Sequence, residues 1–430
     1  MRRRTLLAAT AVALPVTLLG FRPAQAAAPR LDPRTGVPLD TRAQALMARQ
    51  ALAGASGPAL KSATVAGSTR LRLPAPTGRH RIGTVSLHLV DRSRPDPWVP
   101  SVPVRELMVQ VWYPARDVRH HPRAPWVSPA LAALLAPPGS DIELPTTHGH
   151  TGAPALPGRR PVVLYSPGFG VERTAATALV EELVSHGYVV VTIDHTHDSP
   201  LVEFPDGRVA LNAVPPPTGD PADEERLITK AFAARVADTR FVLEAVTVLA
   251  CGGNPDKGRR PLPSGLRDAF DLRQVGMLGH SLGGATAAEM MYLDRRVVAG
   301  GNVDGTALGR VLEGPGGGLN RPFLLLSSDG HGRDTDESWA RLWAGLRGPR
   351  HELQLLRSGH MSFTDYQVLL PQAGVPAADL EPGFGTIDGE RSVRVQLVYQ
   401  LAFVDRYLRG HREPLLDGPS ARYPEMRFLP

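Results

Sequence analysis

Apolar residues along the chain form two patterns, short continuous runs typical of buried strands and longer segments with helical spacing. Runs at 161–166 and 189–194 flank a helical segment at 174–186, which ends before Gly187. Similar runs recur at 275–278, 297–303, 323–327 and 352–356. A last helix is expected over about 391–409. This order predicts an α/β fold with a doubly wound, mostly parallel sheet, whose ligand cleft lies at the carboxyl ends of the strands.

Two other segments, 82–90 and 106–113, alternate apolar and polar residues and predict an antiparallel hairpin at the sheet edge. Two proline-rich inserts interrupt the pattern at 118–160 and 204–225, and we expect both to cover the cleft. The first insert carries a short apolar helix at 128–135. Packing against the sheet edge is expected for this helix, and transient contact with a lipid surface is the alternative.

The first residues have the pattern of an export signal. Three arginines, an apolar stretch and the small-residue site Ala24-Gln25-Ala26 follow one another, which predicts a secretory signal peptide over 1–26 and a secreted protein. Arg3-Arg4 suits the twin-arginine type of signal. The apolar stretch is shorter than the ~20 residues that span a membrane. We expect residues 27–80 to wrap the surface and residues 81–430 to form the main domain.

The chain has a positive net charge, and almost all of its basic residues are arginines. The 430 residues include 48 lysines and arginines, and the formal net charge is +6. Loss of the arginines of the predicted signal lowers this charge to +2, and the remaining arginines are scattered without interleaved aromatic residues. A nucleic-acid partner is therefore disfavoured. The single cysteine, Cys251, excludes an internal disulfide, so core packing must stabilise an exported domain.

The pentapeptide Gly279-His280-Ser281-Leu282-Gly283 fits the G-x-S-x-G nucleophile elbow. It follows the apolar run 275–278 directly and precedes the small-residue helix start at 284–291. A sharp turn between a strand and a helix forces its central residue into strained backbone angles and leaves no room for side chains on either side. Ser281 is therefore the candidate nucleophile.

A serine hydroxyl needs a histidine to accept its proton and a carboxylate to orient that histidine. On this fold the chain order is serine, acid, histidine. His360 follows the strand expected at 352–356, so it lies at a carboxyl strand end. Asp304 follows the strand expected at 297–303. Spacing favours Asp304 as the acid but leaves three alternatives after the next strand, Asp329, Asp334 and Asp336.

The oxyanion of an acyl-transfer reaction needs two backbone N–H donors. Leu282, directly after the nucleophile, supplies one. The other is expected from the glycine-containing loop 166–170, the first loop between a strand and a helix, and we assign it to Phe169.

The segment Asp194-His195-Thr196-His197-Asp198 has alternating polar residues that could ligate a metal. No second cluster with metal-ligand spacing accompanies it in the sequence. We therefore interpret it as a polar loop that rims the cleft, and we expect neither a metal nor a cofactor.

In their joint order these motifs resemble the plasma-type platelet-activating factor acetylhydrolase family, with its bacterial lipase-like members, over about residues 81–410. The resemblance rests on Leu87-His88-Leu89-Val90-Asp91, Val111-Trp112-Tyr113-Pro114-Ala115, Ser166-Pro167-Gly168-Phe169-Gly170, Ser185-His186-Gly187-Tyr188, Asp194-His195, Gly279-His280-Ser281-Leu282-Gly283-Gly284, Val303-Asp304-Gly305 and Gly359-His360-Met361-Ser362-Phe363.

The resemblance implies an α/β-hydrolase fold, with Asp304 as the acid and Phe169 as the first-loop oxyanion donor. It also implies metal-independent hydrolysis of short or oxidised acyl esters, on phospholipids in the animal enzymes. Pro167 departs from the family, because the animal enzymes have histidine before the glycine, and this weakens any inference about the acyl pocket and headgroup.

We therefore interpret the chain as a secreted serine ester hydrolase that acts on a small-molecule or lipid ester through Ser281, His360 and Asp304. A cutinase-type or polyester hydrolase with the same site is the alternative. A binding protein that kept the fold without the activity is the alternative from another class.

Overall fold

The computed structural model describes residues 68–216, 218, 220–313 and 318–429. The predicted signal peptide, residues 1–26, lies outside the described residues, and the segment 27–80 is described only from residue 68. No helix in the described part of the chain is both long and apolar enough to cross a membrane.

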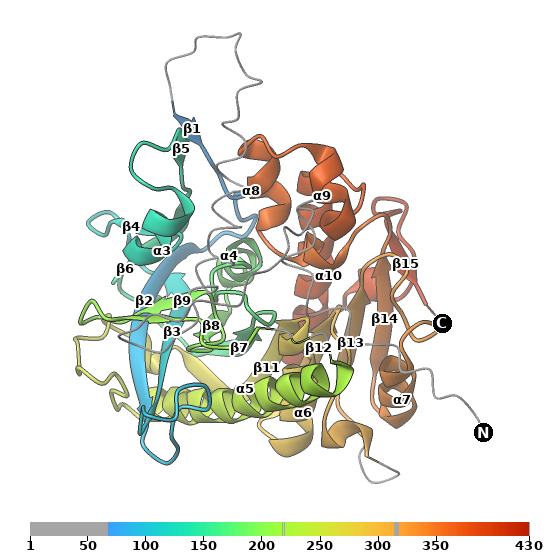
Figure 1. Cartoon of the computed structure of the whole chain (residues 1–430), viewed down its shortest axis with the longest axis horizontal. Coiled ribbons are helices and arrows are strands. Elements are labelled where there is room, and N and C mark those ends of the chain that lie inside the picture. Colours follow the sequence, from blue (N-terminus) through green and yellow to red (C-terminus); the bar gives the residue numbers. More distant parts are fainter. Residues whose placement is uncertain (1–67, 217, 219, 314–317, 430) are drawn as a thin grey trace.

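An 11-stranded sheet forms the centre of the described structure (Figure 1). In spatial order its strands are β15 (Met426–Phe428), β14 (Arg350–Leu355), β13 (Phe323–Ser327), β12 (Val297–Val303), β11 (Phe270–His280), β7 (Arg160–Ser166), β8 (Val189–Asp194), β3 (Arg105–Ala115), β2 (Arg81–Asp91), β6 (Thr146–Thr151) and β4 (Arg123–Pro125). The six strands from β14 to β8 run parallel to one another, whereas β15 and β3, which pair with the two outer strands of this group, are antiparallel. The predicted α/β fold with a mostly parallel sheet is therefore confirmed.

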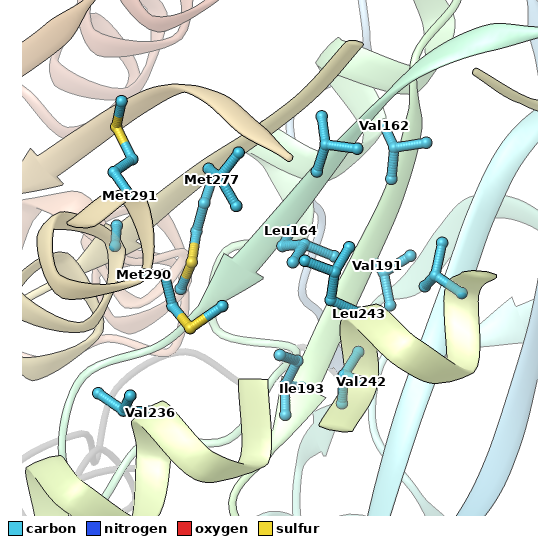
Figure 2. Packing of buried hydrophobic residues seen from close by; sticks show 14 of the residues in the cluster. Val162, Leu164, Val191, Ile193, Val236, Val242, Leu243, Met277, Met290 and Met291 are labelled. Carbon is cyan, nitrogen blue, oxygen red and sulfur yellow. The ribbon is translucent and has the colours of Figure 1, made fainter. Parts of the chain in front are cut away.

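Helices cover both faces of the sheet because the strands alternate their side chains. Val162 and Leu164 of β7 pack with α5 (Pro221–Ala250) and α6 (Leu282–Leu293). Figure 2 shows this core, in which Leu164 lies near Leu243 of α5. Val163 of β7 packs on the other face, with α4 (Thr177–Ser185) and α10 (Gly389–Arg409). The result is a three-layer α/β/α arrangement.

The remaining elements lie at the periphery of these layers. They are β1 (Thr69–Arg70), β5 (Ile142–Glu143), β9 (Leu201–Glu203), β10 (Val209–Leu211), α3 (Pro129–Leu135), α7 (Glu337–Gly345), α8 (Tyr366–Gln372) and α9 (Ala377–Phe384), with short 3-10 helices at Leu266–Asp268, Arg310–Leu312, His360–Phe363 and Pro414–Leu416.

Local sequence explains where the two longest helices begin and end. Asp220 accepts a hydrogen bond from the backbone of the first turn of α5, and Pro221 occupies its first position. Asp388 caps α10 in the same way, and Gly410 ends that helix in a left-handed conformation with φ +73°. Cys251 follows the last residue of α5 and is exposed.

The hairpin of β2 and β3 is antiparallel, as predicted, but it is not the edge of the sheet. β6 pairs with β2, and β4 pairs with β6, so these strands of the insert at 118–160 extend the sheet. Gly149 makes this pairing possible, because a Cβ there would lie 2.6 Å from the Trp112 ring. In the same insert, Leu131 and Leu135 of α3 are buried in a cluster with α8.

The second insert, expected over 204–225, contains β10 and the first turn of α5, and β10 forms a hairpin with β9, which directly precedes the insert. Asn212 joins this hairpin to the loop after β8 by donating a hydrogen bond to the Asp198 carbonyl. The insert therefore rests on the carboxyl side of the sheet, where the cleft is expected.

Candidate active site

Ser281 occupies the sharp turn between β11 and α6, with φ +55° and ψ −125°. Positive φ is strained for a residue with a side chain and costs on the order of 1–3 kcal/mol. The neighbouring glycines permit the turn: a Cβ on Gly283 would overlap the Ser166 carbonyl oxygen, and one on Gly279 would overlap the Gly283 backbone. Ser281 itself is partly exposed. The turn therefore presents the serine hydroxyl at the carboxyl edge of the sheet.

His360 and Asp304 meet at the same edge of the sheet. Asp304 follows β12, and His360 begins the 3-10 helix after β14. The distance from His360 Nδ1 to Asp304 Oδ2 is 2.7 Å. Of the four candidate acids, only Asp304 hydrogen-bonds to His360; Asp329 instead accepts from the Arg357 backbone. When Nδ1–H donates to Asp304, the Nε2 atom of His360 remains available to accept a proton.

His280, the residue before Ser281, holds His360 beside the elbow. The two imidazole rings have their centroids 4.6 Å apart, and His280 Nε2 lies 2.9 Å from the His360 carbonyl oxygen. Burial, followed by the nearby His360, lowers the pKa of His280 to about 3. The ring is therefore neutral at neutral pH and donates its Nε2–H to His360.

Within the described residues, the Ser281 hydroxyl makes no hydrogen bond. The structure thus brings Ser281, His360 and Asp304 to one edge without forming the contact between serine and histidine. Such contacts are often long or poorly aligned before substrate binds.

His331 is a second histidine on the same carboxylate, and our sequence analysis did not single it out. Its Nδ1 lies 2.7 Å from Asp304 Oδ1, and its Nε2 lies 3.2 Å from Asp336 Oδ2. Ser328 also donates to Asp304 from its backbone N–H and its hydroxyl. The position of His331 after β13, at the carboxyl edge shared with Asp304, is the sequence signal that could have identified it.

These contacts set the charges around Asp304. Burial opposes ionisation of the carboxyl, but the hydrogen bonds from His331 and His360 outweigh it and hold the pKa of Asp304 well below its usual value. Burial also disfavours the charged form of His331, yet its bonds to Asp304 and Asp336 raise its pKa to about 10. Asp304 is therefore a carboxylate that lies between His360 and a cationic His331.

His331 predicts a loss of stability at alkaline pH. Its pKa is raised from 6.5 to about 10 on folding, so the protonated ring stabilises the fold fully below pH 6.5 and this contribution is lost as the pH rises through about 10. The unfolding temperature of the parent should fall more steeply over this interval than that of His331→Gln. Parallel curves for the two proteins would contradict the predicted charge on His331.

The loop after β7 lies against the elbow. A Cβ on Gly168 would be 3.4 Å from Ser281 Cβ and 3.2 Å from His280 Nδ1. Among the described residues, neither the backbone N–H of Phe169 in this loop nor that of Leu282 at the start of α6 donates a hydrogen bond. Two free backbone donors thus flank the region next to Ser281.

Apart from the partly exposed His197, the segment 194–198 is buried, so our expectation that it rims the cleft is wrong. His195 and Asp198 are each 1% exposed. His195 Nδ1 lies 2.9 Å from Asp238 Oδ2, and its Nε2 lies 2.9 Å from the Ser166 hydroxyl oxygen. Both ring nitrogens are therefore occupied by protein groups. The sequence pattern does not show this burial, because the partners of these groups lie elsewhere in the chain. Asp198 and His195 contact Arg235 and Asp238 of α5, and Asp194 contacts Arg173.

Another group of side chains in the described part could share a metal ion, namely Asp405, His411 and Glu413 at the end of α10. Arg409 donates to the Asp405 carboxylate in this group, which weakens the case for a bound cation.

Comparison with known proteins places the chain among ester hydrolases. The family model of platelet-activating factor acetylhydrolase, isoform II, matches residues 126–415. The chain is 29% identical over 394 residues to the probable 1-alkyl-2-acetylglycerophosphocholine esterase of Arthroderma benhamiae, an alignment that covers 83% of this chain and 93% of that protein. It is 24% identical over 257 residues to the platelet-activating factor acetylhydrolase of Cavia porcellus, which covers 58% and 57% of the two proteins.

Among solved structures, the chain is similar to a ferulic acid esterase from Streptomyces cinnamoneus. The TM-score is 0.70 and the sequence identity is 38%, with 84% of this chain and 99% of that chain covered.

Proposed function

We propose a mechanism for this chain on the premise that it belongs to the platelet-activating factor acetylhydrolase, isoform II, family and is an ester hydrolase. The Ser281 hydroxyl attacks the ester carbonyl carbon while His360 Nε2 accepts its proton. Asp304 accepts from His360 Nδ1–H and stabilises the imidazolium that forms. The backbone N–H groups of Phe169 and Leu282 bind the oxyanion of the tetrahedral intermediate.

Collapse of this intermediate breaks the bond to the leaving alcohol, which takes the proton from His360. The acyl group then remains on Ser281 as an ester. Water transfers a proton to His360 and attacks this ester, and the second tetrahedral intermediate releases the carboxylic acid as the proton returns to Ser281. The observation that carries the proposal is the 2.7 Å contact between His360 and Asp304 beside the strained Ser281.

As the substrate we propose short acyl esters at the second glycerol position of phospholipids, which the names of the relatives from Arthroderma benhamiae and Cavia porcellus support. A second candidate is an ester of an aromatic acid. It is supported by the ferulic acid esterase, because that protein shares 38% identity over 84% of this chain.

We also propose that residues 1–26 direct export and that the mature enzyme is secreted, with transient contact between enzyme and lipid surface when the substrate is a lipid. The support is the sequence pattern of the segment. N-terminal sequencing of protein collected from culture medium tests the export proposal, and a mature protein that begins with the uncleaved segment would contradict it.

Initial rates on a graded substrate panel test the proposed function. The panel contains p-nitrophenyl esters from acetate to palmitate, a 2-acetyl ether phospholipid, methyl ferulate and a polyester film, each with the parent and Ser281→Ala. Fast, serine-dependent turnover of acetyl esters and of the phospholipid would support the first candidate. Preference for methyl ferulate would favour the second, preference for the film would favour a cutinase-type enzyme, and turnover of none would contradict the proposal.

A further inference from the structure

Arg235, a residue of α5, extends into the loop that carries the Phe169 N–H. Its side chain is fully buried, and its guanidinium contacts two successive carbonyl groups of the loop. Nη1 donates to the Pro167 oxygen at 2.5 Å, and Nη2 donates to the Gly168 oxygen at 2.8 Å. Arginine suits this place because its planar fork offers several donors in fixed directions.

Asp198 completes this arrangement. It accepts from Arg235 Nε at 2.6 Å and from Nη2 at 2.7 Å, which neutralises the buried guanidinium. The same carboxylate accepts from the Gly170 backbone N–H at 3.0 Å. The pair formed by Arg235 and Asp198 thus holds backbone groups of the loop on both sides of Phe169 and leaves the Phe169 N–H without a partner among the described residues.

The contact with Gly168 determines the direction of that N–H group. The Gly168 carbonyl and the Phe169 N–H belong to one planar peptide group, and the described part of the chain has no cis peptide bond. In a trans peptide the two groups point in opposite directions. Because Arg235 fixes the carbonyl on its own side, it directs the Phe169 N–H to the other side of the loop.

The guanidinium also affects how strongly this peptide donates. Hydrogen bonds polarise one another in a low-dielectric interior, so a charged donor on a carbonyl makes the N–H of the same peptide a better donor. We propose that Arg235 is a positioning residue that orients and polarises the Gly168–Phe169 peptide as an oxyanion donor. This role rests on the proposed function, because it assumes an oxyanion beside Ser281.

The ion pairs of a neighbouring residue, Asp238, provide a control that distinguishes a role in catalysis from a role in stabilising the fold. Asp238, one turn further along α5, binds the buried Arg105 at the start of β3. Arg94 also donates to Asp238, from a side chain that is 22% exposed, and within the described residues it makes no hydrogen bond to the loop after β7. Arg94→Gln is therefore the matched control, since it removes an arginine from a buried carboxylate on α5 without touching the oxyanion loop.

The test measures kcat, KM and the inhibition constant of a trifluoromethyl ketone for the parent, Arg235→Gln and Arg94→Gln. The ketone reacts with the Ser281 hydroxyl to form a tetrahedral adduct that carries an oxyanion. Arg235→Gln should lower kcat by roughly 10²- to 10³-fold, the loss typical of one oxyanion donor. Its KM should stay close to that of the parent, and its affinity for the ketone should fall with kcat. Arg94→Gln should change none of the three.

Arg235→Lys is the second variant, and it keeps the assignment testable when Arg235→Gln does not fold. A lysine retains the charge but cannot contact both carbonyls and Asp198 in one plane. It should show the same pattern with a smaller loss, on the order of tenfold in kcat. A kcat near that of the parent, or a loss that leaves ketone affinity unchanged, would overturn the assignment.

These outcomes are distinct from failure of the proposed function. If the parent hydrolyses esters through Ser281 and the Arg235 variants match it, only the role of Arg235 is wrong. If the parent shows no hydrolysis that depends on Ser281, the proposed mechanism itself is wrong.

Discussion

Replacing Ser281 with alanine is expected to lower kcat by about 10⁴- to 10⁶-fold while the protein still folds. The loss is this large because the acyl-enzyme cannot form without the Ser281 oxygen, and the remaining oxyanion donors give only residual catalysis. Alanine also fits the turn, since it is smaller than serine and Ser281 makes no side-chain hydrogen bond in the described structure. Initial rates on p-nitrophenyl acetate, together with the unfolding temperature, measure both effects.

Ser93→Ala is the control for this change. Ser93 is exposed, and among the described residues its hydroxyl donates to Asp91 alone, in the turn after β2. Its variant should keep the kcat of the parent. Activity of Ser281→Ala within about tenfold of the parent would show that Ser281 is not the nucleophile, because no retained group could replace the covalent step.

Replacing Asp304 with asparagine is expected to lower kcat by roughly 10⁴-fold. The amide cannot stabilise the imidazolium of His360 and can favour the wrong tautomer of its ring. In this protein the change also removes the partner of His331, whose pKa of about 10 depends on Asp304 and Asp336. A lowered pKa of His331 in the variant, followed by nuclear magnetic resonance titration, would report the same loss of charge independently of activity.

Asp329→Asn is the matched control for the acid. Asp329 lies in the loop after β13 and accepts a hydrogen bond from the Arg357 backbone, and within the described residues no hydrogen bond joins it to His360. It should retain nearly full activity. The opposite result, an active Asp304→Asn and an inactive Asp329→Asn, would show that the acid is misassigned.

The sequence predicted the parts of the fold that depend on local apolar pattern. β12 and β13 occupy the predicted ranges 297–303 and 323–327, because each is a short, mostly buried run of mainly apolar residues. The proximity of Asp304 and His360 could also be predicted from the sequence, since both residues follow parallel strands whose carboxyl ends share one edge of the sheet. The turn at Ser281 could be predicted because the motif lies between an apolar run typical of a strand and a segment typical of a helix.

What the sequence did not reveal depends on contacts between distant residues. Arg235 and Asp238 resemble a solvated face of α5, yet both are fully buried against partners on other elements. Asp198 and Arg105 are those partners, and nothing in the local pattern pairs them with α5. β6 was missed for a similar reason, because its residues Thr146–Thr151 are polar and its pairing depends on Gly149 fitting against Trp112.

Labelling with a serine-directed fluorophosphonate, followed by mass spectrometry of the labelled peptides, tests the central claim most directly. The account predicts a single covalent adduct on Ser281 in the parent, no adduct in Ser281→Ala, and slower labelling in Asp304→Asn because His360 is then a weaker base. An adduct on another serine, or labelling that persists in Ser281→Ala, would contradict the assignment of Ser281 as the nucleophile.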